Sequence, residues 1–241
     1  MVQIHFITLS STQLWVKENL QKIPDQGWLL VTADQQTAGL GTQGRVWYSP
    51  PGNIYLTLAT KLPQKTLSHK VQFAQIAALA VALTLEQVGF SPRLRWVNDV
   101  ILSDKKVAGI LAEIVANNQY LLIGVGINVN LRPPIVKELE GVITSLFLEQ
   151  KHEFDLEEIR SIFLQKFMQV MDDYFCDRDL PVLMQEIQKR LTIAIGEAVK
   201  VLTNEKIIAG IFLGLDLKGQ VMLQVDGQVV SISQGRMLKN S

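Results

Sequence analysis

The chain has very few residues of the kinds that build disulfides and metal sites. Its 241 residues include one cysteine, Cys176, and three histidines, at positions 5, 69 and 152. A single cysteine excludes an internal disulfide and is typical of a reducing compartment. The histidines lie too far apart in the sequence to show ligand spacing, so the sequence predicts no zinc site. Cys176 ends a stretch with helical periodicity, residues 170–176, which favours a structural thiol over a nucleophile.

Net charge and long apolar runs are also missing. The 23 lysines and arginines equal the 23 aspartates and glutamates, and the basic residues are scattered, which argues against a duplex-binding surface. The longest apolar stretch, residues 76–85, is too short to span a membrane. The first residues lack the basic and then apolar layout of a signal peptide. We therefore expect a cytoplasmic protein that binds neither nucleic acid nor a membrane.

Apolar residues are plentiful, since 48% of the chain is hydrophobic and 19% is charged, so a sizeable core is expected. A capping box between Ser10 and Gln13 predicts a helix that runs to about Leu20, and Asp155 with Glu158 predicts another. Ser68 is the expected cap of a long helix over residues 71–88, and a further helix is expected over residues 180–190. Strands are predicted over residues 3–9, 28–33, 53–60 and 120–129, with a hairpin around residues 103–105.

Near the C-terminus the pattern of apolar and turn-forming residues changes to one that is typical of short strands. The predicted strands occupy residues 198–202, 207–213, 220–225 and 228–232, and Asp226-Gly227 is a strong signal for a two-residue hairpin turn. These strands predict a small β-barrel of about fifty residues. We accordingly expect two domains, residues 1–192 and residues 193–241.

A glycine-rich loop over residues 36–53 carries glycines at G-x-G-x-x-G spacing. A dinucleotide-binding loop of this kind must open into a helix, but Pro50 and Pro51 follow here, and proline cannot occupy a helix interior. A protein kinase needs H-R-D and D-F-G motifs, which the chain lacks. The loop ends in Arg45 and Trp47, and an arginine can clamp a phosphate in bidentate fashion. The alternative is a flexible surface connection.

Several polar residues interrupt the apolar strands that follow. Asn98 and Asp99 lie in a β-rich run although both residue types are depleted from strands, so they either form a turn or face a ligand. Lys106 begins the return strand of the hairpin, where it can face a phosphate or remain an ordinary solvated lysine. The strand over residues 120–129 contains two glycines, which often mark a bulge or a close ligand approach, and it ends near Asn128.

Four ordered segments of the chain together resemble the motifs of the biotin protein ligase family. That family carries G-R-G-R-x-G-R-x-W-x-S-P, K-W-P-N-D, K-x-x-G-I-L-x-E and G-x-G-I-N. The corresponding segments here are residues 39–50 (GLGTQGRVWYSP), 95–99 (RWVND), 106–113 (KVAGILAE) and 124–128 (GVGIN). The resemblance covers essentially the whole chain, and four motifs in order are far more specific than one glycine pattern.

The resemblance implies an α+β fold, with a mixed β-sheet flanked by helices and a small C-terminal SH3-like barrel. It also implies two chemical steps that use ATP, Mg²⁺ and biotin. The biotin carboxylate attacks the α-phosphate of ATP to give biotinyl-5′-AMP, and a lysine of a biotin carboxyl carrier protein then attacks this anhydride. Neither step needs an enzyme nucleophile, so catalysis consists of positioning and charge neutralisation.

The resemblance also assigns roles to individual residues. The head group of biotin would be bound by Ser11, Thr12 and Gln36 and by the backbone of Gly39 and Gly109. Arg45 and Lys106 would hold the carboxylate and the α-phosphate, and Trp47 would form an aromatic wall when the loop closes. Asn98 and Asn128 would serve the nucleotide, and Mg²⁺ would bind through the phosphates with Asn128 as a possible ligand. Asp99 would interact with the acceptor lysine, whereas Glu113 is expected to be structural.

The chain departs from the family motifs in the glycine loop. Leu40 and Thr42 stand where the family usually has arginines, and only Arg45 is kept. In the family, the arginine at the position of Thr42 helps to retain the activated intermediate. We therefore hypothesise that this chain closes its loop less tightly and releases biotinyl-5′-AMP more readily, or that another cation compensates. Arg95 and Val97 are milder changes from lysine and proline.

Two alternative functions stay open from the sequence. A lipoate or octanoate transferase of the related fold handles a similar acyl chain, and a non-catalytic biotin or nucleotide sensor would keep the pocket without turnover. The chain begins directly at the predicted catalytic strand, so we expect no helix-turn-helix and no DNA-binding role. The oligomeric state is also open, between a monomer and a homodimer formed through a sheet edge.

Overall fold

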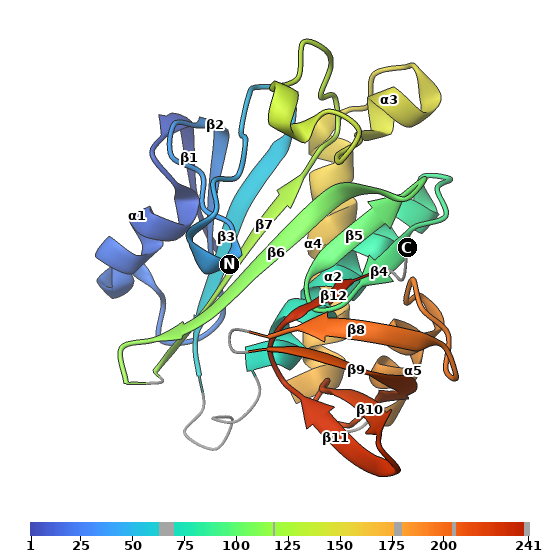
Figure 1. The fold of residues 1–241 in the computed structure, drawn as a ribbon. Helices are drawn as coiled ribbons and strands as arrows, with labels where there is room; N and C mark the ends of the chain where they lie inside the picture. The colour runs from blue at the N-terminus through green and yellow to red at the C-terminus, as the bar shows by residue number, and fades with distance from the viewer. Residues whose placement is uncertain (63–69, 118, 176–179, 204–205, 239–241) are drawn as a thin grey trace.

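The computed structural model describes residues 1–62, 70–117, 119–175, 180–203 and 206–238, so the predicted Ser68 cap and Cys176 lie outside the described residues. Two β-sheets organise the chain (Figure 1). The larger sheet has seven strands in the order β1-β2-β3-β7-β6-β5-β4. Only β1 and β2 pair in parallel, so the sheet is mixed, and the predicted α+β class is confirmed. The strands are β1 (Val2–Leu9), β2 (Leu29–Gln36), β3 (Ile54–Lys61), β4 (Arg93–Arg95), β5 (Asp99–Leu102), β6 (Lys105–Val115) and β7 (Tyr120–Ile127).

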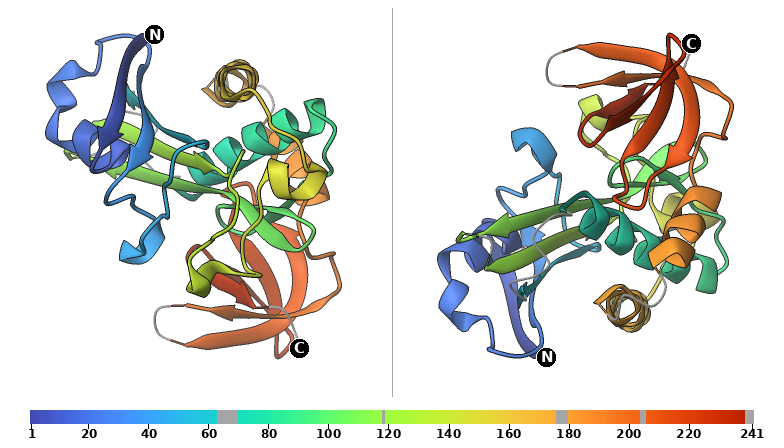
Figure 2. Two further views of the ribbon diagram at one scale, coloured as in Figure 1. Left: turned by 90° about the horizontal axis from the view of Figure 1, so that it is seen from above. Right: turned by 90° about the horizontal axis from the view of Figure 1, so that it is seen from below.

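Helices cover both faces of this sheet. The long helices α2 (Lys70–Gln87) and α4 (Leu156–Phe175) pack on one face with α5 (Leu180–Lys189), and the short helix α1 (Thr12–Glu18) lies on the other (Figures 1 and 2). Among the described residues, no helix is both long enough and apolar enough to cross a membrane. The remaining helical segments are α3 (Leu146–Gln150) and the 3-10 turns Leu20–Lys22, Thr42–Gly44 and Lys137–Leu139.

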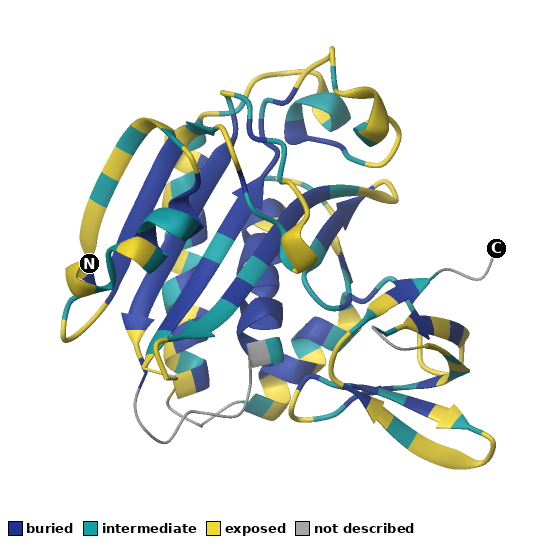
Figure 3. Cartoon of the chain, turned by 60° about the vertical axis from the view of Figure 1, so that its left-hand side comes forward, coloured by how far each residue is buried: buried dark blue, intermediate teal, exposed yellow. Residues whose placement is uncertain are grey.

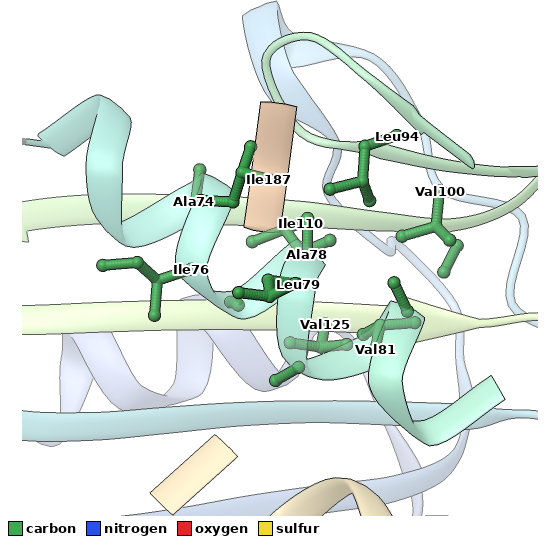
Figure 4. Packing of buried hydrophobic residues seen from close by; sticks show 14 of the residues in the cluster. Ala74, Ile76, Ala78, Leu79, Val81, Leu94, Val100, Ile110, Val125 and Ile187 are labelled. Carbon is green, nitrogen blue, oxygen red and sulfur yellow. The ribbon is translucent and has the colours of Figure 1, made fainter. Parts of the chain in front are cut away.

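Strand alternation in β7 separates the two faces. Leu121, Ile123 and Val125 point to the side of α2, where they join the main hydrophobic core. Figure 4 shows this packing, with Val125 and Ile110 of the sheet against Ala78, Leu79 and Val81 of α2. Alanines on α2 let the helix approach the sheet closely. The other face of β7 carries Gly124 and Gly126, which leaves a shallow surface in the centre of the sheet (Figure 3 shows these central strands largely buried).

One predicted helix cap is wrong and another is confirmed. The N-cap of α1 is Ser11, whose side chain accepts a hydrogen bond from the Leu14 backbone N–H, and not Ser10. Ser10 lies in the connection between β1 and α1, where its carbonyl accepts a hydrogen bond from the Ala38 N–H at 2.8 Å. Asp155 does cap α4, since its carboxylate accepts from the backbone of Glu157 at 2.8 Å.

The C-terminal residues form a separate five-stranded antiparallel sheet in the order β11-β10-β9-β8-β12. The predicted turn is confirmed, since Asp226 and Gly227 have φ values of 49° and 81°, as a two-residue hairpin requires. The last strand, β12 (Arg236–Leu238), is not among the strands predicted from the sequence. Within the described residues β11 and β12 are the edges of the sheet, and no pairing closes it into the expected barrel. The strands are β8 (Ala198–Leu202), β9 (Ile207–Leu215), β10 (Val221–Val225), β11 (Gln228–Ile232) and β12 (Arg236–Leu238).

The C-terminal sheet contacts the rest of the molecule through the turn between β9 and β10. The Gly219 carbonyl accepts hydrogen bonds from Trp96 Nε1 at 3.0 Å and from Gln75 Nε2 at 2.8 Å. Gly219 has φ +73°, and a Cβ at this position would lie 2.2 Å from Gln75 Oε1. Glycine is therefore required both by the backbone conformation and by the close approach of α2.

Candidate active site

The sheet face that carries α1 has a row of small residues at its centre. The strand registers place Tyr55 of β3, Gly126 of β7, Gly109 of β6 and Asp99 of β5 side by side across four strands. The two central positions have no side chains, so they form a flat floor between a tyrosine and an aspartate. The predicted close approach at the strand glycines therefore has a specific location on the sheet.

The indole of Trp47 covers this floor. A Cβ on Gly126 would lie 2.4 Å from Trp47 Cε2, and a Cβ on Gly109 would lie 2.8 Å from Trp47 Cζ3. Trp47 Nε1 is buried and has no hydrogen-bond partner among the described residues. Lys106 Nζ lies 5.0 Å from the centroid of the Trp47 ring, within cation–π range. The predicted aromatic wall thus lies directly on the glycine floor.

A close ion pair lies beside the indole. Lys106 Nζ is 2.5 Å from Asp99 Oδ1, and both side chains are only about a fifth exposed (22% and 23%). Asn98 is held by a hydrogen bond from its amide Nδ2 to the Ile110 carbonyl at 2.7 Å. Of the two possibilities for Asn98 and Asp99, the structure therefore has Asn98 in a turn before β5 and Asp99 facing the cation of the next strand.

The first turn of α1 meets the end of β2. The backbone N–H of Thr12 donates to Gln36 Oε1 at 2.9 Å, and the Gln36 amide Nε2 donates to Ser49 Oγ at 2.9 Å. The Ser49 hydroxyl in turn donates to the Trp47 carbonyl at 2.8 Å. These bonds connect α1 to the segment that carries the indole, so the predicted head-group residues and the aromatic wall belong to one network.

Sequence reasoning missed two residues of this network, Gln13 and Thr57. Gln13 is 2% exposed, and its amide Nε2 donates to Glu113 Oε2 at 2.8 Å. Thr57 is fully buried, with its hydroxyl oxygen 2.9 Å from Thr12 Oγ1 and 3.1 Å from Gln13 Oε1. Gln13 directly follows Ser11 and Thr12 in the same helical turn, and this adjacency could have identified it as a site residue. Thr57 had none, because its partners lie more than forty residues away.

The glycine loop folds back on itself as a short ladder. The Gly41 N–H donates to the Arg45 carbonyl at 2.7 Å, and the Trp47 N–H donates to the Gly39 carbonyl at 2.8 Å. The Arg45 side chain is exposed and donates to the hydroxyl and the carbonyl of Thr42, at 2.9 and 3.2 Å. Arg45 therefore does not face the cavity, and its predicted contact with carboxylate and phosphate stays a prediction.

The end of this loop is tied to the sheet by Tyr55. Its phenol donates to the Pro50 carbonyl at 2.7 Å, and the residue is 2% exposed. Burial raises the pKa of the Tyr55 phenol, so the group is neutral and remains a donor at physiological pH.

A cavity lies between α1, the loop and the floor. It gathers most of the predicted site residues, but Gly39, Arg45, Asp99 and Asn128 are not part of its lining. Asn128 is buried and donates from its amide to the Thr144 carbonyl at 2.9 Å. The predicted residues that do line the cavity are Ser11, Thr12, Gln36, Trp47, Asn98, Lys106 and Gly109.

The described residues contain no group of three or more histidine, cysteine, aspartate or glutamate side chains able to hold a metal ion. The expected binding of Mg²⁺ through the phosphates of ATP needs few protein ligands, because Mg²⁺ keeps several waters, and it stays a prediction. The proposed contribution of Asn128 to such an ion stays a prediction.

Comparison with known proteins gives consistent results. Residues 5–130 match the profile of the Biotin/lipoate A/B protein ligase family. The chain is 31% identical over 235 residues to the bifunctional ligase/repressor BirA of Bacillus subtilis, which covers 95% of this chain and 71% of that protein. It is 31% identical to the biotin–[acetyl-CoA-carboxylase] ligase of Paracoccus denitrificans, with coverage of 82% and 83%. The biotin protein ligase of Aquifex aeolicus in complex with biotin and ATP superimposes with a TM-score of 0.84 at 27% identity, with coverage of 98% and 97%.

Proposed function

Because the chain belongs to the Biotin/lipoate A/B protein ligase family, we propose that it is a biotin–[acetyl-CoA-carboxylase] ligase. It activates biotin with ATP and transfers it to one lysine of a biotin carboxyl carrier protein. The observation that carries this proposal is the single cavity whose lining combines Lys106 with the polar network of Ser11, Thr12 and Gln36. Lys106, which can bind a carboxylate and a phosphate, thus lines the same cavity as hydroxyl and amide groups that can form hydrogen bonds with a polar ring.

In the first step, an oxygen of the biotin carboxylate attacks the α-phosphorus of ATP. The bond from this phosphorus to the bridging oxygen of the β-phosphate breaks, and pyrophosphate leaves. Two anions must approach each other, so the charge of Lys106 lowers their repulsion in a site where Trp47 excludes water. Arg45 would add a second charge after leaving Thr42, because in the present loop its guanidinium donates to that residue.

In the second step, the amine of the acceptor lysine attacks the acyl carbon. The acyl carbon–oxygen bond to the phosphate breaks, and AMP leaves. The amine must first lose a proton, and the Asp99 carboxylate lies beside the cation of the site, with its Oδ1 2.5 Å from Lys106 Nζ. We assign to Asp99 the binding of the incoming ammonium group and the acceptance of its proton.

ATP brings Mg²⁺, which supplies charge neutralisation at the phosphates. Asn98 lines the cavity and would bind the nucleotide, and Asn128 would contribute an amide oxygen to the ion or to the nucleotide. These two roles rest on the resemblance of the sequence motifs.

Two alternatives differ in measurable ways. A lipoate or octanoate transferase would bind an acyl chain whose end makes few hydrogen bonds, whereas this cavity is lined at α1 by hydroxyl and amide groups. Isothermal titration of the protein with biotin and with lipoate separates these ligands, and tighter binding of lipoate would overturn the proposal. A non-catalytic sensor would bind biotin but release no pyrophosphate when ATP and Mg²⁺ are added.

A further inference from the structure

We propose that Glu113 and Gln13 are positioning residues that set the direction of the hydrogen bonds in the head-group pocket. Glu113 does not line the cavity, whereas Gln13 does, and together they make the Thr12 hydroxyl act as a hydrogen-bond acceptor toward the ligand. The inference rests on the proposed function, since it takes biotin as the ligand. It assigns a role to the glutamate that sequence reasoning regarded as structural.

The first link is the orientation of the Gln13 amide. A carboxylate only accepts hydrogen bonds, and Glu113 Oε2 lies 2.8 Å from Gln13 Nε2. The opposite orientation of the amide would place two oxygen atoms at this distance, which is repulsive. Lys17 Nζ lies 2.8 Å from both oxygens of Glu113 and fixes the carboxylate in place. The Gln13 carbonyl oxygen therefore faces Thr57.

The second link is the proton of the Thr57 hydroxyl. Gln13 Oε1 can only accept, and Thr57 Oγ1 lies 3.1 Å from it in a fully buried position. Leaving a buried carbonyl without a donor is unfavourable, so Thr57 donates its one proton to Gln13. Thr57 Oγ1 is also 2.9 Å from Thr12 Oγ1. Since its proton is already used, Thr57 accepts in this second bond.

The third link is the Thr12 hydroxyl, which must donate to Thr57. The competing acceptor, Gln36 Oε1, is farther away at 3.3 Å and already receives the Thr12 backbone N–H at 2.9 Å. Thr12 lines the cavity, so it presents oxygen lone pairs to a ligand. Its neighbour Ser11 already accepts from the Leu14 N–H at 3.4 Å and can donate its own proton.

The backbone provides an independent observation in support of this arrangement. A Cβ on Gly124 would lie 2.7 Å from Gln13 Oε1, so only glycine leaves room for the amide in its present place. Thr57, Gly124 and Leu111 lie in one row across three strands, next to the row of the glycine floor. The sheet thus leaves space for the Gln13 side chain. The donor-to-acceptor direction of every bond in the network is then set by the Glu113 carboxylate, which can only accept.

This polarity selects the chemistry of the ligand. An acceptor at Thr12 next to a donor at Ser11 fits a ring in which an N–H is adjacent to a carbonyl group, as in the cyclic urea of biotin. A dithiolane ring offers neither group. Glu113, which does not line the cavity, therefore contributes through Gln13 to the discrimination between these two acyl substrates.

The test measures biotin binding and initial rates with four variants of the full chain. Glu113→Gln lets the Gln13 amide rotate, and Gln13→Glu places two carboxylates together, so each is expected to weaken biotin binding about tenfold, or about 1.4 kcal/mol. The exchanged pair Q13E/E113Q restores an acceptor toward Thr57, and its biotin affinity is expected to return to within about threefold of the wild-type value. Lys17→Met is the matched control, because Lys17 contacts the same carboxylate without determining the amide direction, and it is expected to change biotin affinity by less than about threefold. The KM for ATP and the thermal midpoint are measured for each variant.

A biotin analogue with one ureido nitrogen methylated gives a readout that a purely structural role would not change. One analogue lacks the N–H group that would donate to the Thr12 hydroxyl, and it is expected to bind the wild-type protein weakly. Because that hydrogen bond is already absent, Glu113→Gln is expected to lower the affinity for this analogue by less than about a further threefold. Equal losses for biotin and for both N-methyl analogues would overturn the inference, as would failure of a folded Q13E/E113Q to recover. If Glu113→Gln does not fold, Gln13→Met frees the Thr57 proton to donate to Thr12, and the same selective loss is expected.

The inference and the proposed function fail in different ways. A wild-type protein that binds no biotin overturns the proposed function and the inference together. A wild-type protein that binds biotin, with variants that respond alike to all ligands, overturns the inference alone.

Discussion

Gly126 and the indole of Trp47 are in direct contact, since a Cβ on Gly126 would lie 2.4 Å from both Cε2 and Nε1 of the ring. The indole thus occupies the floor of the cavity. Its N–H group is buried without a partner among the described residues, which costs about 1–3 kcal/mol. This position is therefore one from which an incoming ligand can displace the ring.

Gly126→Ala tests whether the floor must be flat. The added methyl group is expected to push Trp47 away and to destabilise the protein by about 1–3 kcal/mol, measured by urea unfolding. Biotin affinity, measured by isothermal titration, is expected to fall at least about tenfold because the methyl group also enters the cavity. In a Trp47→Ala background the loss of stability is expected to disappear while the loss of affinity remains. Unchanged biotin affinity of Gly126→Ala would contradict this description of the floor.

Asp99→Asn separates the two chemical steps. The substitution keeps the shape of the side chain but removes the charge that lies 2.5 Å from Lys106 Nζ. The rate of adenylate formation, measured by the pyrophosphate exchange assay, is expected to change by less than about threefold, because Lys106 keeps its charge. Transfer from preformed adenylate to the carrier lysine is expected to fall at least about tenfold, because the base is lost.

Lys106→Met is the companion variant for this experiment. Removing the cation is expected to slow adenylate formation by about 10²–10³-fold, the usual effect of losing one charge-stabilising group. An Asp99→Asn protein that transfers biotin at the wild-type rate would exclude Asp99 as the proton acceptor.

Thr42→Arg tests the hypothesis of a leaky loop. The Thr42 hydroxyl accepts a hydrogen bond from the Arg45 guanidinium at 2.9 Å. An arginine at this position removes that hydroxyl and repels Arg45, so both guanidinium groups become available to the adenylate phosphate. The rate of biotinyl-5′-AMP release, measured by rapid filtration, is expected to fall about tenfold. Release at an unchanged rate would reject the hypothesis.

Gly219→Ala tests how the C-terminal sheet supports the active site. An alanine methyl would lie 2.2 Å from Gln75 Oε1, and the carbonyl of Gly219 also holds Trp96, which lies two residues before Asn98. Gly227→Ala is the matched control, because Gly227 also has a positive φ, +81°, but nothing lies within 4 Å of an added Cβ. Gly219→Ala is expected to lose about 1–3 kcal/mol more stability than the control in urea unfolding, and to lower kcat. Equal losses in both variants would mean that backbone strain alone is responsible.

Much of the fold and of the site was predictable from the sequence. The glycines of β6 and β7 and the polar pair at Asn98 and Asp99 contradict the usual composition of strands, and such contradictions indicate close approaches and sites. Strand alternation places Gly124 and Gly126 on one face of β7, but only the register between β6 and β7 adds Gly109 to that face. The motif resemblance added the topology, which local patterns alone do not define.

The features that were missed depend on contacts between distant segments. Ser10 and Ser11 are equally good caps by residue type, and only the pairing of the Ser10 carbonyl with Ala38 decides that Ser11 begins the helix. The Gln13–Thr57 contact joins residues that are 44 positions apart. The direction of Arg45 depends on the shape of the loop, which no propensity determines.

The most direct test of the proposed function is mass spectrometry of a biotin carboxyl carrier domain after incubation with this protein, ATP, Mg²⁺ and biotin. The proposal predicts one added biotinyl group on one lysine, absent without ATP and strongly reduced with the Lys106→Met variant. A carrier domain of unchanged mass, or one modified by lipoate in place of biotin, would contradict it.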